Sequence, residues 1–138
     1  MLEKLLTRDQ FRETVLSRHA GKCCVPDCLI PAVDAHHILN RNLYVEAEEF
    51  GGYFFGNGAN LCSAHHLQAE QTLIRTKDLY AWCQIDTPAT PRHLSPDLEY
   101  DTWGNVWLDA YNRLKGELWD DEGCQKALRA AHVLWMFS

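Results

Sequence analysis

The chain lacks long hydrophobic runs. No stretch of its 138 residues approaches the roughly 18 consecutive apolar residues that a membrane-spanning helix needs. The N-terminal sequence MLEKLLTR carries charges throughout and has no apolar run before a small-residue cleavage site, so it does not predict a secretory signal. Internal repeats and low-complexity tracts are absent as well. We therefore expect a cytoplasmic protein with no membrane partner, of a length within reach of a single domain.

Basic residues are also outnumbered by acidic ones, since 13 Lys and Arg residues against 19 Asp and Glu residues give a formal net charge of −6. A protein that grips a polyanion over its whole surface is usually basic. The first 22 residues are the exception, with five basic residues against three acidic ones. Four of the basic residues lie along one predicted helix face or just beyond it: Arg8, Arg12, Arg18 and Lys22. This face either contacts phosphate groups or is a solvated helix surface.

Six cysteines are present, and in a reducing compartment their spacing favours metal binding over disulfides. Structural zinc is usually held by two short-spaced pairs of thiolate or imidazole ligands. Cys23 and Cys28 form one such pair, and Cys62 and His65 form the other. Cys24 is an alternative to Cys23 as a ligand. The cysteines outside this set are expected to be small buried apolar residues: Cys24, Cys83 and Cys124.

Three histidines remain once this zinc site is assigned: His36, His37 and His66. A metal bound by only two or three protein ligands keeps positions open for water or substrate. A histidine beside such a metal that is not itself a ligand can take a proton from the attacking water near neutral pH. The leftover histidines therefore predict a second, hydrolytic metal centre.

Four short motifs lie between residues 18 and 72: CCVPDC, DAHHI, the Gly51–Gly52 pair and NGANLCSAHH. Their order and spacing resemble the HNH endonuclease family, in the branch with an embedded structural zinc. The resemblance implies an α+β fold with a ββα-metal core, in which a β-hairpin and the following helix clamp one divalent ion. The resemblance itself covers residues 18–72. With the predicted N-terminal helix added, we expect the nuclease core to occupy residues 1–76. A mostly helical extension, residues 77–138, would pack on the core to form one compact domain.

The resemblance also implies residue roles and a reaction. His36 and His66 would bind the catalytic ion, which is Mg2+ or another divalent ion such as Mn2+, Ni2+ or Zn2+, and His37 would be the general base. The implied reaction is hydrolysis of phosphodiester bonds in DNA, with RNA as an alternative substrate. Cutting both strands would need a second copy of the site, through a homodimer or partner protein, or through rebinding. The competing hypotheses are an inactive zinc-stabilised binding or assembly module and, last, a disulfide-bonded protein.

Two further polar residues have implied roles. Asn57 matches the family's asparagine, which pins the hairpin loop and orients the base, and Asn60 is the weaker candidate for that position. Glu70 lies one helical turn after His66, so it would share the same helix face. It would add a third ligand or hold a metal-bound water.

Local patterns predict the remaining elements. Thr7 and Gln10 form a capping box for a helix that we expect to end near residue 20. The other expected elements are a strand over 32–39 and helices over 63–74, over 77–82 with Thr76 as cap, and from 120–122 onward. Three prolines between residues 88 and 96 predict an extended strap. The segment from 97 to the C-terminus should supply core residues: Leu118, Val133, Leu134, Trp135 and Phe137.

The long connection of the hairpin contains a group of glutamates and a group of aromatic residues. Its three glutamates, Glu46, Glu48 and Glu49, are expected to lie in a solvated loop. Its aromatic residues, Tyr53, Phe54 and Phe55, would close the core over the hairpin or, as the less favoured alternative, stack on a nucleic-acid base. His93 lies outside every motif and is expected at the surface.

Overall fold

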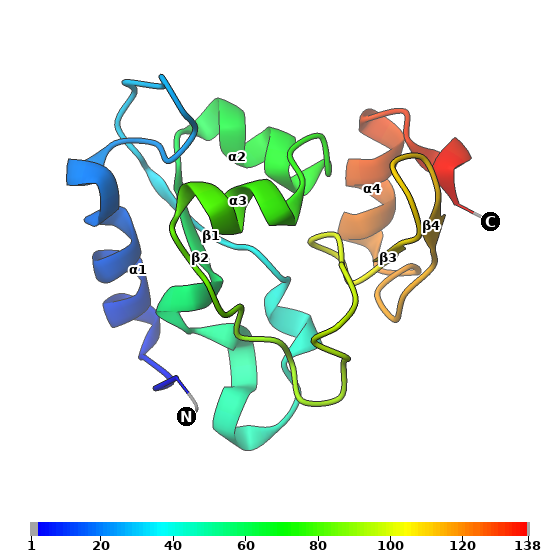
Figure 1. Cartoon of the computed structure of the whole chain (residues 1–138), viewed down its shortest axis with the longest axis horizontal. Helices are drawn as coiled ribbons and strands as arrows, with labels where there is room; N and C mark the ends of the chain where they lie inside the picture. The colour runs from blue at the N-terminus through cyan, green and yellow to red at the C-terminus, as the bar shows by residue number, and fades with distance from the viewer. Residues whose placement is uncertain (1–2, 138) are drawn as a thin grey trace.

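A computed structural model describes residues 3–137 of the chain, which form an α+β protein with two small antiparallel sheets (Figure 1). The first helix, α1 (Arg8–Leu16), begins with the predicted capping box. The Thr7 side chain accepts a hydrogen bond from the backbone N–H of Gln10, and the Gln10 side chain accepts one from the backbone N–H of Thr7. The helix ends before residue 20. A 3-10 turn at Arg18–Gly21 follows, with His19 and Ala20 at positive φ.

The early end of α1 has an identifiable cause. The side-chain amide of Asn60 donates hydrogen bonds to the backbone carbonyls of Arg18 and Lys22, at 3.2 and 2.7 Å. These two carbonyls can face one amide only if the chain turns back between them, so the turn replaces the last helical residues that the sequence predicts.

The central hairpin joins β1 (Asp34–His37) to β2 (Gly58–Leu61), with His36 opposite Ala59 and His37 opposite Gly58. Strand β1 is thus shorter than the predicted 32–39. α1 packs directly on this hairpin, because Gly58 offers no side chain there. A Cβ at this position would lie 2.3 Å from the Val15 side chain.

Two helices follow the hairpin, α2 (Ser63–Glu70) and α3 (Thr76–Trp82). α2 ends four residues before the predicted limit, and Thr72 just beyond it has a φ of +63°. The prediction that Thr76 caps α3 is wrong. Arg75 is the residue at the cap position, and the Thr76 hydroxyl donates its hydrogen bond to the backbone carbonyl of Tyr100.

The C-terminal part contains a second hairpin that the sequence did not predict, β3 (Val106–Trp107) paired with β4 (Arg113–Leu114). Helix α4 (Glu122–Ala130) follows, and the Asp121 side chain caps it by accepting hydrogen bonds from two backbone N–H groups. The other 3-10 turns are Arg41–Leu43, Ala47–Gly52, Phe55–Asn57 and Leu134–Met136. Within the described chain, no helix combines the length and apolar character that crossing a membrane requires.

The proline strap is tied to the long hairpin connection. The Tyr44 hydroxyl donates a hydrogen bond to the Ala89 carbonyl at 2.6 Å. The Glu49 carboxylate accepts from the backbone N–H of Arg92 at 3.2 Å. Glu49 is consequently 5% exposed, so its predicted place in a solvated loop is wrong. Glu48 and Glu46 are exposed, as expected.

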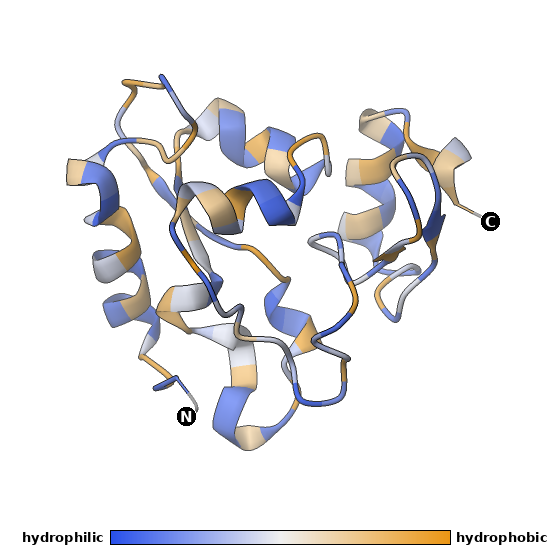
Figure 2. Ribbon diagram, viewed as in Figure 1, coloured by the Kyte–Doolittle hydropathy of each residue, from blue (hydrophilic) through white to orange (hydrophobic). Residues whose placement is uncertain are grey.

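Among residues 3–137, three groups of buried apolar residues form the core. Hydrophobic and hydrophilic positions alternate around α1 and α4 (Figure 2). The first group includes Ile38 and Leu61 of the hairpin and Leu79 of α3, so its packing continues past residue 76. Cys24, Cys83 and Cys124 are buried, as predicted. Trp135 is 67% exposed, and its predicted place in the core is wrong because it lies on the outward side of the last 3-10 turn.

Candidate metal centres

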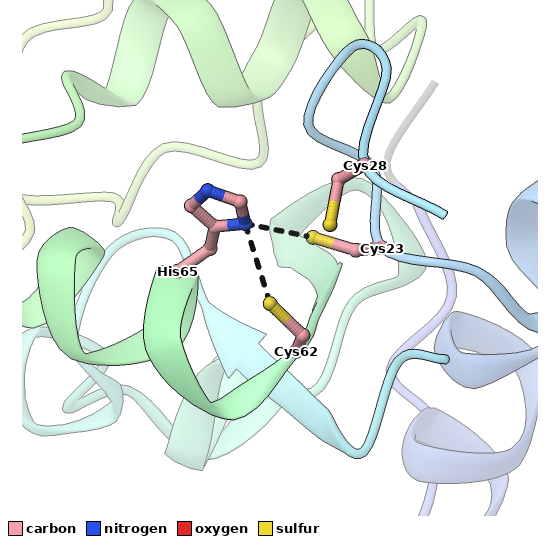
Figure 3. A group of neighbouring side chains, drawn as sticks. All are labelled: Cys23, Cys28, Cys62 and His65. Carbon is pink, nitrogen blue, oxygen red and sulfur yellow. Dashed lines mark hydrogen bonds between the residues drawn. The ribbon is translucent and has the colours of Figure 1, made fainter. Parts of the chain in front are cut away.

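The first candidate centre contains Cys23, Cys28, Cys62 and His65, whose side chains point toward one another (Figure 3). All four ligand atoms lie within 4.8 Å of one another. His65 Nδ1 lies 3.4 Å from Cys23 Sγ and 3.3 Å from Cys62 Sγ. Zinc bonds of about 2.3 Å to sulfur and about 2.0–2.1 Å to nitrogen give a tetrahedral S···N edge of about 3.5–3.6 Å. The cluster therefore fits a metal such as zinc.

Local structure brings these ligands together from two segments. Cys23 and Cys28 lie in a tight loop, in which Cys23 N–H donates to the Ile30 carbonyl at 2.9 Å and Cys28 N–H to the Val25 carbonyl at 3.0 Å. Cys62 is the cap residue of α2 and His65 lies in its first turn. The α2 start thus holds one ligand pair three residues apart.

Cys24 is not part of the centre, because its side chain packs beside Cys83 in the first core group. The thiols of the centre differ in their electrostatic environments. Burial raises the pKa of Cys23 to about 11. Burial also acts to raise the pKa of Cys62, but backbone N–H groups at the start of α2, led by that of His65, lower it overall.

The second candidate centre contains His36 of β1 with His66 and Glu70 of α2, whose ligand atoms also lie within 4.8 Å of one another. The His36 and His66 ring centroids are 5.1 Å apart, and His66 Nε2 lies 3.1 Å from Glu70 Oε1. His36 Nε2 is buried and has no hydrogen-bond partner among residues 3–137. Buried nitrogens seldom lack a partner, so this atom fits a metal ligand. Burial, with the neighbouring His66 and His37, holds the pKa of His36 well below 6.5, which keeps the imidazole in the neutral form that binds metals.

Asp34 is a member of this centre that the sequence analysis missed. Its Oδ2 lies 3.0 Å from His66 Nδ1. A carboxylate on the second ring nitrogen fixes the tautomer and orientation of a metal-binding histidine. The sequence contained a signal for this placement. Residues two apart in a strand share a face, and Asp34 precedes His36 by two. The pKa of His66 is raised, mainly by its hydrogen bond to Glu70 and, against the effect of burial, also by Asp34.

His37 lies next to this centre without belonging to its ligand group. Its ring stacks on Phe11, with centroids 4.7 Å apart, and meets Tyr53 edge-on at 5.2 Å. Burial lowers the pKa of His37 to about 4, against a raising effect of the Gly51 carbonyl, and the charge of Arg41 lowers it further. His37 is therefore neutral at pH 7. Its Nε2 is buried with no hydrogen-bond partner in the described chain.

A half-open cavity of about 250 Å³ joins these residues. His36, His37, His66 and Glu70 all line it. Arg41 lines it too and is exposed, with no ion pair to any residue between 3 and 137. Because the ligand group, a neutral histidine and an unpaired cation share one cavity, the site can take a negatively charged group beside a bound ion.

Asn57 and Asn60 are both fully buried but hold different parts of the chain. Asn57 Oδ1 accepts from the Leu39 N–H at 2.9 Å, and its Nδ2 donates to the carbonyls of Leu39 and Gly52, each at 3.1 Å. It therefore fixes the end of the hairpin loop to the residue two beyond His37. Asn60 holds the turn before the cysteine loop instead.

The predicted phosphate-contacting residues lie away from this cavity, since none of Arg8, Arg12, Arg18 and Lys22 lines it. The Arg18 guanidinium donates to the carbonyls of Gly58 and Phe55 and lies over the Phe55 ring at 4.1 Å. Arg12 donates to the Val33 carbonyl at 3.3 Å. These two arginines therefore hold the hairpin, and the contact of this face with nucleic acid stays a prediction.

The interpretation of the two centres depends on their own geometry, because no family model, no curated protein and no solved structure matches this chain.

Proposed function

We propose that this chain is a metal-dependent endonuclease of the HNH family that hydrolyses phosphodiester bonds in DNA. In this proposal His37 is the general base and His36, His66 and Glu70 hold the catalytic ion. One observation carries it: a hairpin and the helix that follows it bring a His-His-Glu group and a neutral histidine to the same cavity. The order β1, β2, α2 agrees with a ββα-metal core.

Each residue of the histidine cavity has a separate role in the proposed hydrolysis. A divalent ion at the His-His-Glu group, Mg2+ or another such as Mn2+, Ni2+ or Zn2+, would stabilise charge that develops on the scissile phosphate. His37 would take the proton of the attacking water at Nδ1, because its Nε2 is buried. Asp34 would keep His66 in the tautomer that presents Nε2 to the cavity. Arg41 would contact a phosphate of the bound strand.

The cysteine cluster has a structural role in this proposal. Zn2+ at Cys23, Cys28, Cys62 and His65 would join the N-terminal loop to the start of α2, and α2 carries His66 and Glu70. His65 and His66 are adjacent, so the zinc ligand and the catalytic ligand leave the same helical turn in different directions. A structural ion here would therefore fix the helix that presents the second centre.

An inactive zinc-stabilised module for binding nucleic acid or assembling with a partner protein is the second candidate. The net charge of −6 favours the protein-assembly form of this candidate, because a protein that grips a polyanion is usually basic. The use of Arg12 and Arg18 for internal hydrogen bonds favours the same form. Both candidates share the structural zinc. They differ in whether the second centre cleaves a nucleic-acid backbone.

Nicking of supercoiled plasmid separates the two candidates. The wild-type protein should nick in Mg2+ or Mn2+ and not in divalent-free buffer. His66→Ala should lose the exchangeable ion and the nicking, while the circular dichroism spectrum and the zinc content stay unchanged. His93→Ala, at the surface and outside the cavity, is the matched control and should nick as the wild type does. A wild-type protein that binds both ions yet cleaves no plasmid, single-stranded DNA or RNA would favour the inactive module.

A further inference from the structure

The histidine cavity has a wall that comes from outside the hairpin and α2. Thr102 and Trp103 line it, and they belong to the segment that runs between α3 and the C-terminal β3–β4 and α4 elements (Figure 1). Trp103 is 8% exposed and packs with Cys124, Leu128 and Val133. One residue thus contacts both the C-terminal core group and the cavity.

Trp103 completes the C-terminal end of α2. The last carbonyls of a helix lack partners within the helix. In α2 the carbonyls of Leu67 and Ala69 accept from the backbone N–H of Gln71. The carbonyl of Glu70, the last helical residue, accepts instead from Trp103 Nε1–H at 2.8 Å. The indole therefore holds the backbone of the residue whose carboxylate belongs to the second centre.

The loop that carries Trp103 is itself rigidly held. Asp101 Oδ1 accepts from the backbone N–H groups of Trp103 and Asn105, at 2.9 and 3.0 Å. Asp101 Oδ2 pairs with Arg113 at 2.9 Å, and both residues are buried. Arg113 also donates to the Thr72 hydroxyl at 2.9 Å, two residues beyond α2. The same buried network thus anchors the loop and the chain that leaves α2.

The loop also reaches the other side of the cavity. The backbone carbonyl of Thr102 accepts from the Asn40 N–H at 2.8 Å, and the Thr102 hydroxyl donates to the His37 carbonyl at 3.4 Å. Adjacent residues of one loop therefore bond to the end of β1 and to the end of α2. These are the two elements whose relative position decides how far Glu70 lies from His36.

We propose that Trp103 is a positioning residue for the second metal centre, acting through the backbone of Glu70. This inference rests on the proposed binding of a divalent ion by His36, His66 and Glu70. Glu70 depends most on such support, because it ends its helix and its side chain is 46% exposed, against 27% for His66. Loss of an outer partner of a ligand typically weakens metal binding 10–100-fold, so removal of this backbone hydrogen bond should cost about tenfold, at the lower end.

Calorimetric titration of zinc-loaded protein with Mn2+ tests this role without reference to activity. Trp103→Phe keeps most of the ring but removes the N–H donor. It should weaken Mn2+ binding about tenfold and leave the zinc content unchanged. Trp119→Phe is the matched control, because the Trp119 ring packs on Phe137, away from α2, and it should bind Mn2+ as the wild type does. Equal affinities for the wild type and Trp103→Phe would overturn the role.

A double-mutant cycle separates positioning from general support of the fold. If Trp103 acts through Glu70, Trp103→Phe should cause no further loss of Mn2+ affinity in a Glu70→Ala background. The same tenfold loss in both backgrounds would overturn the proposal. A wild-type protein that binds no second ion would defeat the proposed function as well, whereas failure of the variants alone would defeat only this inference.

A measurement on the wild-type protein covers the case in which Trp103→Phe does not fold. The Trp103 indole N–H resonance should shift when a second equivalent of Zn2+ is added, because its acceptor is the backbone of a ligand residue. An indole resonance that stays unshifted through saturation of the second centre would overturn the proposal.

Discussion

Acid should destabilise this protein through His37. Burial lowers the pKa of His37 from its ordinary value of 6.5 to about 4. Between these values the unfolded chain binds a proton at this residue and the folded chain does not, so the free energy of unfolding falls as the pH falls through the window. Each pKa unit corresponds to about 1.4 kcal/mol, which gives about 3 kcal/mol in total. About 2 kcal/mol of this is lost between pH 7 and pH 5.

Urea unfolding at pH 7 and pH 5 measures this loss. His37→Phe removes the titrating group and keeps a ring against Phe11. It should therefore lose about 2 kcal/mol less than the wild type over this interval. His132→Asn, at an exposed histidine with positive φ, is the matched control for the loss of a histidine. The zinc content is measured at each pH, because protonation of the zinc ligands would add a loss common to all variants. Identical losses for the wild type and His37→Phe would refute the burial argument.

The other variants test the centres separately. Cys62→Ala should lose zinc and fold poorly, because structural zinc can contribute on the order of 10 kcal/mol to folding. Elemental analysis and circular dichroism measure the two effects. Cys124→Ala is the control and should keep the zinc. Asp34→Asn should weaken Mn2+ binding about 10–100-fold in calorimetry, and an unchanged affinity would show that the carboxylate does not orient His66. Arg41→Ala should weaken duplex binding and reduce the slope of log affinity against log salt by about 1. An unchanged slope would remove Arg41 from the interface.

The sequence predicted the elements whose signals are local. The Thr7–Gln10 box is specified by two side chains three residues apart, and the structure confirms it. The zinc-type cluster follows from ligand spacing within two short segments. The sequence also predicted that Glu70 shares a helix face with His66, and the two side chains lie 3.1 Å apart.

Features that depend on distant partners escaped the sequence analysis. Nothing near Trp103 indicates that its indole bonds to a helix end 33 residues away. Glu49 resembles its exposed neighbours in sequence, and only the strap that crosses it explains its burial. The second hairpin has two residues in each strand, which is too short for an alternating pattern to be recognised. Its buried Arg113 is stabilised by Asp101, which is distant in sequence.

Single-turnover cleavage of a labelled duplex by His37→Ala tests the central claim most directly. The variant should bind the duplex in Ca2+ as the wild type does and retain both ions. Its cleavage in Mg2+ or Mn2+ should be about 10²–10⁴-fold slower, the usual contribution of a general base. If His37→Ala cleaves as fast as the wild type, His37 does not activate the water, and the assignment of this cavity as a nuclease centre with a histidine base is contradicted.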